Sequence, residues 1–431
     1  MNNAKENIRN IERRIWSSHK RPMNSGIELP LLVWKYISLC PESFIIPQGS
    51  EMDDLLRQYD VSFNELNRCF RDLEKANPNF HKSFSGFFKF IEHHHHELEL
   101  KKWMDVLKEM DYTETVDIKN VIREVFRKAL DYFIKRNSHY EFTDTIEISR
   151  LMARLAYTNI ESNEGNITWI PFVRTGEMAI AAYEESNHNA VVHAQAETEI
   201  TFSIAIFNCI IHDVPTENFR MNWELKESPL RDYNTFLSFI PMFGRNENEQ
   251  LEVLLDEAER KASRTVLLTT QGILFKQNLA KHRKLMVYEK LLSAIIFLPD
   301  NLLPYSRIRL VLLVFDRKQK PDNVIFVNAE NLFQGSKRSD KLSEETIINL
   351  VNTIQQRTEV PGFSKLVNMD EIKANLFNLS VNRYIQQPKS EVLSITLEEA
   401  QKQAEELQQK LIEVSRELTD KISQFKKLVN K

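Results

Sequence analysis

The residues of this sequence that could do chemistry gather in two short stretches. One is Ile170-Pro-Phe-Val-Arg-Thr-Gly-Glu-Met, where an apolar segment passes through a glycine turn into a helical segment, 179–185. The other is the aromatic run Tyr233–Gly244, which includes Asn234 and Ser238. Glycines in a turn between a strand and a helix let the backbone approach a ligand and adopt positive φ. The first stretch contains one such glycine, Gly176, between its apolar and helical segments.

Histidines and cysteines could bind a metal, but their arrangement argues against it. The consecutive residues His93–His96 fall within a helical pattern, where successive side chains point in different directions and cannot coordinate one ion together. Cys40, Cys69 and Cys209 are scattered and lie in apolar contexts, which favours buried, reduced thiols. We therefore predict no metal site.

The composition is that of an ordinary globular protein. Of the 431 residues, 42% are hydrophobic and 27% are charged, which allows two or three domains with a substantial core. No apolar run reaches the length of a membrane span, and the N-terminus is charged and carries no signal-peptide pattern. We expect a cytoplasmic protein without membrane contact.

Charge and glycine content limit what the protein can bind. The formal net charge is −4, whereas a protein that grips DNA over its whole surface is usually basic. We expect any DNA contact to be weak or indirect. Only 9 residues are glycine, when ordinary usage would give roughly 30. A protein that cradles a nucleotide-like cofactor in glycine-rich turns should not be this poor in glycine.

The elements that would position these stretches are clearest in the C-terminal half. The pattern predicts a helix over 251–261 and a basic helix over Leu279–Leu292. Another helix should begin after Ser343, because Thr346 follows three residues later with acidic residues between them. Apolar, strand-like runs alternate with these helices: Thr265–Phe275, Leu292–Leu303, Arg309–Asp316 and Val324–Ala329. The alternation indicates an α/β fold whose sheet is covered on both faces.

The N-terminal 130 residues are predicted to be helical. Asn2–Trp16 is basic and amphipathic, and Pro30 lies where the first turn of an apolar helix tolerates proline. The periodicity then predicts one helix over Ile118–Lys135 and another over Ile146–Tyr157.

Several segments, in this order, resemble one family of DNA-modifying enzymes. They are Gly272–Phe275, Leu292–Leu303, Val327–Phe333, Lys341–Ile347 and Pro361–Ile385. Together they resemble the C-terminal half of DNA adenine-N6 methyltransferases, and more narrowly the modification subunit of type I restriction–modification systems. The resemblance implies an N-terminal helical domain at 1–130 and a Rossmann-like, S-adenosylmethionine-dependent methyltransferase domain at 131–388. A long, coiled-coil-like helix would follow at 389–431.

The resemblance also indicates where the family binds S-adenosylmethionine. The family has an acidic residue where this chain has Ile170, and loop glycines where it has Arg174 and Glu177. The family's carboxylate for the ribose hydroxyls is replaced here by Ala196. The degenerate pocket would comprise Ile170, Pro171, Arg174, Thr175, Gly176, Gln195 and Ala196. We therefore expect no cofactor, or S-adenosylmethionine if the chain is an active enzyme. For Arg174, a surface salt bridge with Glu177 three residues later is the alternative to binding an anion.

The family's catalytic motif, (Asn/Asp)-Pro-Pro-(Phe/Tyr), is altered as well. The matching stretch here comprises Phe239, Ile240, Pro241, Met242 and Phe243. Depending on the alignment, Phe239 or Ile240 takes the place of the residue that accepts hydrogen bonds from the adenine amino group, and neither side chain can accept one. Phe243 would still stack on a flipped base. We expect no catalytic residue.

The C-terminal segment has the pattern of a partner helix. Its apolar positions follow heptad spacing: Leu397, Ala400, Ala404, Leu407, Leu411, Val414 and Leu418. A long helix with one narrow apolar stripe needs a partner. By resemblance, residues 391–431 would bind a motif-complete methyltransferase subunit, a DNA-specificity subunit or both. The alternative is that this helix folds back on the N-terminal helices.

One hypothesis and two alternatives follow. The hypothesis is a degenerate, catalytically inactive adenine-N6 DNA methyltransferase-like subunit that acts as a scaffold in a bacterial restriction–modification or anti-phage complex. The first alternative is an active, site-specific DNA adenine-N6 methyltransferase with divergent motifs, in which Asn234 or Ser238 accepts from the adenine amino group. The second is a nucleotide or anion sensor that uses Arg174 in the old cofactor pocket.

Overall fold

The computed structural model describes most of the chain. The described residues are 26–58, 61–91, 97–111, 117–137, 145–157, 166–221, 230, 232–239, 247–260, 262–299, 302, 308–330, 342–386, 405–406, 408–411 and 413–416. The chain divides into two units, Met1–Ile385 and Gln386–Lys431, which are described separately. Whether 1–130 folds as a domain of its own stays a prediction.

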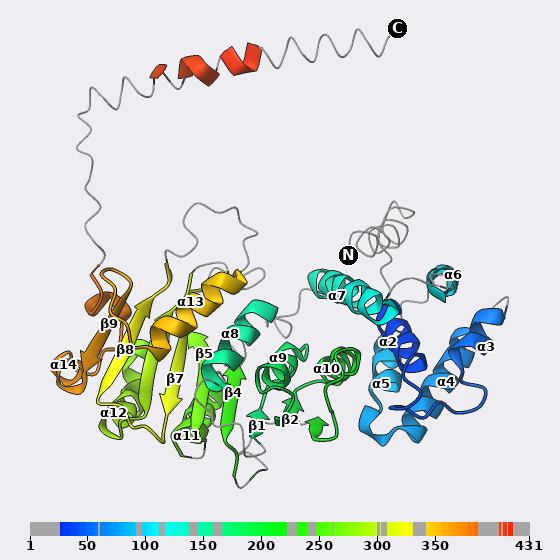
Figure 1. Ribbon diagram of the computed structural model, residues 1–431, viewed down its shortest axis with the longest axis horizontal. Helices are drawn as coiled ribbons and strands as arrows, with labels where there is room; N and C mark the ends of the chain where they lie inside the picture. Colours follow the sequence, from blue (N-terminus) through cyan, green and yellow to red (C-terminus); the bar gives the residue numbers. More distant parts are fainter. Residues whose placement is uncertain are drawn as a thin grey trace. The chain divides into compact units, whose positions relative to one another are not determined.

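The N-terminal part of the first unit is helical (Figure 1). Its elements are α2 (Glu28–Ser38), α3 (Met52–Arg57), α4 (Phe63–Ala76), η1 (Pro78–Phe80), α5 (Ser83–Ile91), α6 (Glu97–Asp111) and α7 (Ile118–Asn137). Pro30 lies in the first turn of α2, where its missing N–H costs no helical hydrogen bond. The prediction of a helical N-terminal region is confirmed. Asn2–Trp16 and His93–His96 lie outside the described residues.

The described strands form one mixed sheet. They are β1 (Ile167–Ile170), β2 (Val191–Ala196), β3 (Phe219–Met221), β4 (Thr235–Phe239), β5 (Arg264–Thr270), β6 (Leu292–Phe297), β7 (Leu310–Asp316), β8 (Asn323–Asn328) and β9 (Ser364–Asn368). Their order is β3-β2-β1-β4-β5-β7-β6-β8-β9. The first five pair in parallel, β7 is antiparallel to both of its neighbours, and β9 is antiparallel to β8. The apolar runs predicted as strands thus form β5 to β8.

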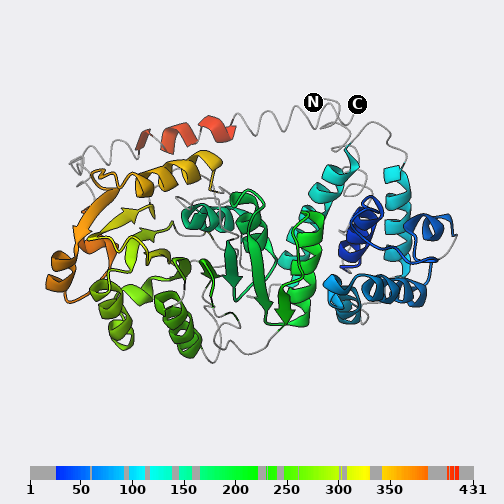
Figure 2. The same ribbon diagram turned by 60° about the horizontal axis from the view of Figure 1, so that its bottom comes forward.

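Helices cover both faces of the sheet (Figure 2). One face carries α8 (Ile146–Tyr157), α9 (Glu177–Glu185), α10 (Glu199–Ile211) and α13 (Glu344–Gln355), and the other carries α11 (Glu247–Arg260), α12 (Ala280–Tyr288) and α14 (Met369–Ala374). Short 3-10 turns are η4 (Gln271–Leu274), η5 (Gln277–Leu279) and η7 (Val381–Arg383). Val266 and Leu268 of β5 enter the first core, and Leu267 enters the second. The predicted α/β fold with two covered faces is confirmed.

The helix α10 joins the helical region to the sheet. All its residues from Thr201 to Ile211 are buried and most are apolar, as expected of a helix enclosed on every side. Phe207 packs against Phe84 and Phe87 of α5, with ring centroids 4.8 and 5.4 Å apart. One hydrophobic core therefore includes residues of α2, α10 and the sheet.

The basic helix predicted over Leu279–Leu292 is shorter in the structure. α12 ends at Tyr288, and Lys290 adopts a left-handed φ of 54°. The N–H of Leu291 then donates to the carbonyl of Met286 (3.0 Å), which closes the helix in a Schellman motif. The helix stops because Leu292 is needed as the first residue of the buried strand β6.

The second unit is described at 405–406, 408–411 and 413–416, all of which are helical. Leu411 and Val414, two positions of the predicted heptad stripe, are 73% and 63% exposed. The other heptad positions lie outside the described residues, so the coiled coil stays a prediction. In the described ranges, no helix is both long enough and apolar enough to cross a membrane.

Candidate active site

The sheet has a topological switch point between β1 and β4. From β1 the chain continues outward to β2 and β3 on one side, and β4 and β5 continue on the other. In open α/β sheets, ligands bind in the crevice outside the carboxyl ends of the two strands at such a point. In this chain the crevice is bordered by the loop 171–176 after β1 and by Phe239 at the end of β4.

The loop after β1 is held by backbone hydrogen bonds. The N–H of Val173 donates to the carbonyl of Gln195 in β2, and the N–H of Gly176 donates to the carbonyl of Val173, both at 2.8 Å. Gly176 precedes α9 with φ 89°, and a Cβ there would lie 3.0 Å from the carbonyl oxygen of Ala205. Only glycine fits this approach to α10, so Gly176 is required by helix packing and by its positive φ.

Arg174 fills the crevice instead of lining it. Its φ is 49°, a left-handed value that is uncommon outside glycine. Its guanidinium carbon lies 4.2 Å from the ring centroid of Phe239. Arg174 and Phe239 are only 3% and 2% exposed, so the cation and the ring stack inside the protein. A buried cation–π pair therefore occupies the carboxyl ends of β1 and β4.

The two positions where the resembled family has carboxylates lie in the core. Ile170 ends β1 and is fully buried, and Ala196 ends β2 with 1% exposure. Both belong to the hydrophobic core on the α10 side of the sheet. Gln195 is also buried, and its backbone carbonyl receives the hydrogen bond from the loop. Neither strand end offers a carboxylate at the matching position.

Glu177 makes a contact that the sequence did not reveal. The side-chain amide of Asn208 in α10 donates to the carbonyl of Thr175 (2.9 Å) and to the carboxylate of Glu177 (3.0 Å). This amide ties the loop and the first residue of α9 to α10, so Glu177 has a positioning contact in the first turn of α9.

The polar residues proposed for an active enzyme are placed unfavourably. Asn234 precedes β4, and its side-chain oxygen accepts from the N–H of Ile167 at the start of β1 (2.9 Å). It therefore lies at the amino end of β4, about 16 Å along the strand from Phe239 at 3.3 Å per residue. Ser238 is 1% exposed. Ile240, Pro241, Met242 and Phe243 lie outside the described residues.

One group of side chains could hold a metal ion, although the sequence analysis predicted no metal site. Ligand atoms of Asp256, Glu259 and His282 lie within 4.8 Å of one another. The last two are buried, and Nδ1 of His282 lies 3.2 Å from the Glu259 carboxylate. The cluster joins α11 to α12 on the face of the sheet opposite α10. Asp256 and Glu259 lie one turn apart on α11, whereas His282 is 23 residues beyond Glu259, so only the packing of the two helices brings it to them.

Sequence comparisons point to one family. The sequence model described as N-6 DNA Methylase matches residues 253–392. The MjaVII methylase subunit of a type I restriction enzyme from Methanocaldococcus jannaschii is 26% identical over 396 residues, covering 81% of this chain and 66% of that protein. The MjaVIII methylase subunit is 24% identical and matches 62% of this chain over 53% of its own length. This chain thus spans less than two thirds of the length of both relatives.

Structural comparisons agree with this fold. The methyltransferase subunit of the Streptococcus thermophilus type I restriction–modification system superimposes with a TM-score of 0.71 at 17% identity, covering 89% of this chain and 98% of that one. A chain from a study of complex assembly in a type I system gives 0.65 at 14% identity, with 98% of both chains covered. With the sequence matches, these results confirm the resemblance to the N6 DNA methyltransferases of type I restriction–modification methylase subunits.

Proposed function

We propose that this chain is a catalytically inactive, methyltransferase-like subunit that acts as a scaffold in a bacterial restriction–modification or anti-phage complex. The observation that carries the proposal is the buried stack of Arg174 on Phe239 in the switch-point crevice. S-adenosylmethionine is cationic at its sulfonium, so a guanidinium beside the methionyl position repels it as well as occupying its space.

The missing carboxylates support the same conclusion. Hydrogen bonds to charged groups contribute about 1.5–3 kcal/mol each. Replacing two such acceptors by Ile170 and Ala196 removes roughly 3–6 kcal/mol of cofactor binding, a factor of about 10²–10⁴ in affinity. Moving Arg174 off the Phe239 ring would cost about 2 kcal/mol more when the pair is desolvated.

The active-enzyme alternative is less well supported. Asn234 is engaged at the wrong end of β4 and Ser238 is buried. An acceptor for the adenine amino group would have to come from elsewhere. The sensor alternative requires Arg174 to leave the Phe239 ring before it can receive an anion. No observation favours either of these over the scaffold.

The scaffold role rests on the second unit. Leu411 and Val414 carry apolar side chains of the heptad stripe and are exposed in the isolated chain. A helix with such a stripe buries it against another helix. We propose that residues 391–431 bind a DNA-specificity subunit, a motif-complete methyltransferase subunit or both. Type I restriction–modification proteins that share this fold have been studied as assemblies.

The test is calorimetry of the full chain with S-adenosylmethionine, with the Streptococcus thermophilus relative as a positive control. We expect no heat of binding for this chain. Arg174→Gly should not restore binding, because Ile170 and Ala196 still provide no acceptor. Micromolar binding by the unmodified chain, followed by methyl transfer to DNA, would overturn the proposal and establish the enzyme instead. The gene neighbourhood gives a further check, since a scaffold requires a motif-complete methyltransferase encoded nearby.

A further inference from the structure

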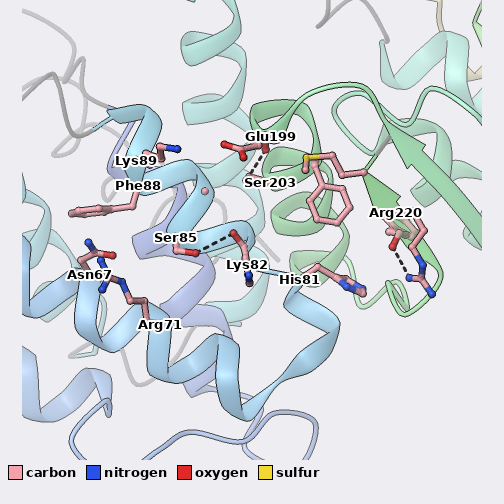
Figure 3. A pocket seen from close by; sticks show the side chains of 14 residues that line it. Asn67, Arg71, His81, Lys82, Ser85, Phe88, Lys89, Glu199, Ser203 and Arg220 are labelled. Carbon is pink, nitrogen blue, oxygen red and sulfur yellow. Dashed lines mark hydrogen bonds between the residues drawn. The ribbon is translucent and has the colours of Figure 1, made fainter. Parts of the chain in front are cut away.

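A cavity of about 620 Å³ lies where the helical region meets the edge of the sheet (Figure 3). Residues of α4, α5 and the turn before α5 form one wall, and the start of α10 and β3 form the other. No residue of loop 171–176 or of β4 lines it, so the cavity is separate from the switch-point crevice. Its volume lies in the range of small-molecule sites, roughly 300–1,000 Å³.

Positive charge surrounds this cavity. Figure 3 shows Arg71 and Lys89 on the helical wall and Arg220 on the side of β3. Within the described residues, none of the three forms an ion pair with a carboxylate. Lys82 also lines the cavity and interacts electrostatically with Glu74. The chain as a whole carries a net charge of −4, so the positive charge around this cavity contrasts with the overall charge of the protein. A local group of cations favours an anionic ligand.

The wall contributed by the turn before α5 is strained and fixed. His81 and Lys82 are consecutive non-glycine residues with left-handed φ values of 51° and 66°. Such backbone strain gathers at functional sites, where surrounding contacts hold it. Here Nε2 of His81 lies 3.3 Å from the carbonyl oxygen of Thr216, and the Thr216 hydroxyl donates to the carbonyl of Asn79 (3.2 Å). These bonds tie the turn to the loop before β3, so the cavity is preformed.

Apolar side chains supply the remaining surface. Phe88 and Phe202 are buried and Met221 is 42% exposed, and all three line the cavity. Glu199, in the first turn of α10, is the carboxylate among the lining residues. Cations suit a phosphate, the apolar side chains suit a flat ring, and a carboxylate accepts hydrogen bonds from sugar hydroxyls.

We propose that this cavity binds a nucleoside monophosphate, with its phosphate at Lys89 and Arg71 on the helical wall and the rest of the ligand toward β3 (Figure 3). A single nucleotide fits a concavity of this size. Duplex DNA instead needs an extended basic face that tracks its backbone. The ligand would bridge the helical region and the sheet, and it would act independently of the crevice filled by Arg174.

The experiment is calorimetry of the full chain with AMP, GMP, CMP and UMP as probes. Parallel titrations use the matching nucleosides, inorganic phosphate, a short DNA duplex and S-adenosylmethionine. We expect at least one monophosphate to bind more tightly than both its nucleoside and inorganic phosphate. Lys89→Gln should weaken that binding about 10- to 100-fold, as expected for a lost charged contact. Met221→Trp should block it sterically, and Lys318→Gln, an exposed change in the turn after β7, should leave it unchanged.

Arg220→Gln is a weaker test because its guanidinium also donates to the carbonyls of Glu217 and Phe219, both at 2.7 Å. Lys89 is exposed and keeps the test independent of folding. The proposal fails if no monophosphate binds at about 1 mM, the weak end of specific binding. It also fails if inorganic phosphate binds equally well, or if Met221→Trp has no effect. DNA binding that is lost in Lys89→Gln without any nucleotide binding would assign the surface to nucleic acid instead. Because S-adenosylmethionine is titrated separately, failure here leaves the scaffold proposal standing.

Discussion

Arg174 gives a sharp test of how the crevice is filled, because two of its features affect stability in opposite ways. Its guanidinium lies 4.2 Å from the Phe239 ring, and both side chains are buried. A desolvated cation–π pair of this kind contributes about 2 kcal/mol. Its φ of 49° is left-handed, and that conformation costs a residue with a Cβ roughly 1–2 kcal/mol.

These magnitudes predict an unusual order of variants. Arg174→Ala removes the stack and keeps the strained backbone, so it should lower the free energy of unfolding by about 2 kcal/mol or more. Arg174→Gly removes both the stack and the strain, so its loss should be smaller by about 1 kcal/mol. Where φ is negative, the order is reversed, because glycine is less favourable than alanine by roughly 0.5–1 kcal/mol. In a protein that already carries Phe239→Leu, Arg174→Ala should lower the free energy of unfolding by about 1–2 kcal/mol less than it does in the wild type, because the stack is already lost.

Urea unfolding followed by tryptophan fluorescence measures all four variants. Lys320 is a matched control for the backbone effect, because its φ is 42° and it lies in an exposed turn after β7. Lys320→Gly should again have a higher free energy of unfolding than Lys320→Ala, by about 1 kcal/mol. This difference should be the same with and without Phe239→Leu. If Arg174→Ala is more stable than Arg174→Gly, or if Phe239→Leu leaves the cost of Arg174→Ala unchanged, the stacked, left-handed arginine is refuted.

Three further predictions concern the rest of the chain. Gly176→Ala should lower the free energy of unfolding by about 3 kcal/mol, because it combines left-handed strain with a Cβ 3.0 Å from the Ala205 carbonyl oxygen. The control Gly49→Ala has open space around it. It should cost only about 1 kcal/mol in the same urea assay. Burial raises the pKa of Glu28 from 4.5 to about 8 in the folded protein. The folded state therefore holds the Glu28 proton more tightly than the unfolded state does. The stabilisation that this proton provides is complete below pH 4.5 and is lost as the pH rises to 8. The stability of the wild type relative to Glu28→Gln should therefore fall by up to about 5 kcal/mol across that window, and a constant difference would contradict the burial. Deleting 391–431 should leave the thermal transition of the first unit unchanged and abolish co-purification with its partner; loss of the transition would instead place the helix in the chain's own core.

Local patterns in the sequence predicted much of the fold. The apolar runs of the C-terminal half became β5 to β8, because a strand buried on both faces shows as an uninterrupted apolar segment. The helix after Ser343 begins as expected, since the Ser343 hydroxyl accepts from the N–H of Thr346. Ile146–Tyr157 forms a helix with the predicted bounds. Each of these features depends on residues close together in the chain.

Contacts between distant residues could not be predicted in the same way. Arg174 and Phe239 meet only because β1 and β4 pair in parallel, and no local pattern encodes that pairing. The same holds for Glu259 and His282, which depend on how α11 packs against α12. Asn234 looked available as a catalytic acceptor in the sequence, and only the register of β4 showed it at the opposite end of the strand.

The crevice residues make packing contacts of their own. In a site built for a charged ligand, each buried polar group left unpaired in the empty state costs about 1–3 kcal/mol. Here Ile170 and Ala196 are part of the core, and the charge of Arg174 lies over the Phe239 ring. The loop itself is fixed by the Asn208 amide rather than by a ligand. The strand ends and the loop therefore have packing contacts of their own, while the buried hydroxyls of Thr175 and Ser238 have no hydrogen-bond partner among the described residues and carry such a cost.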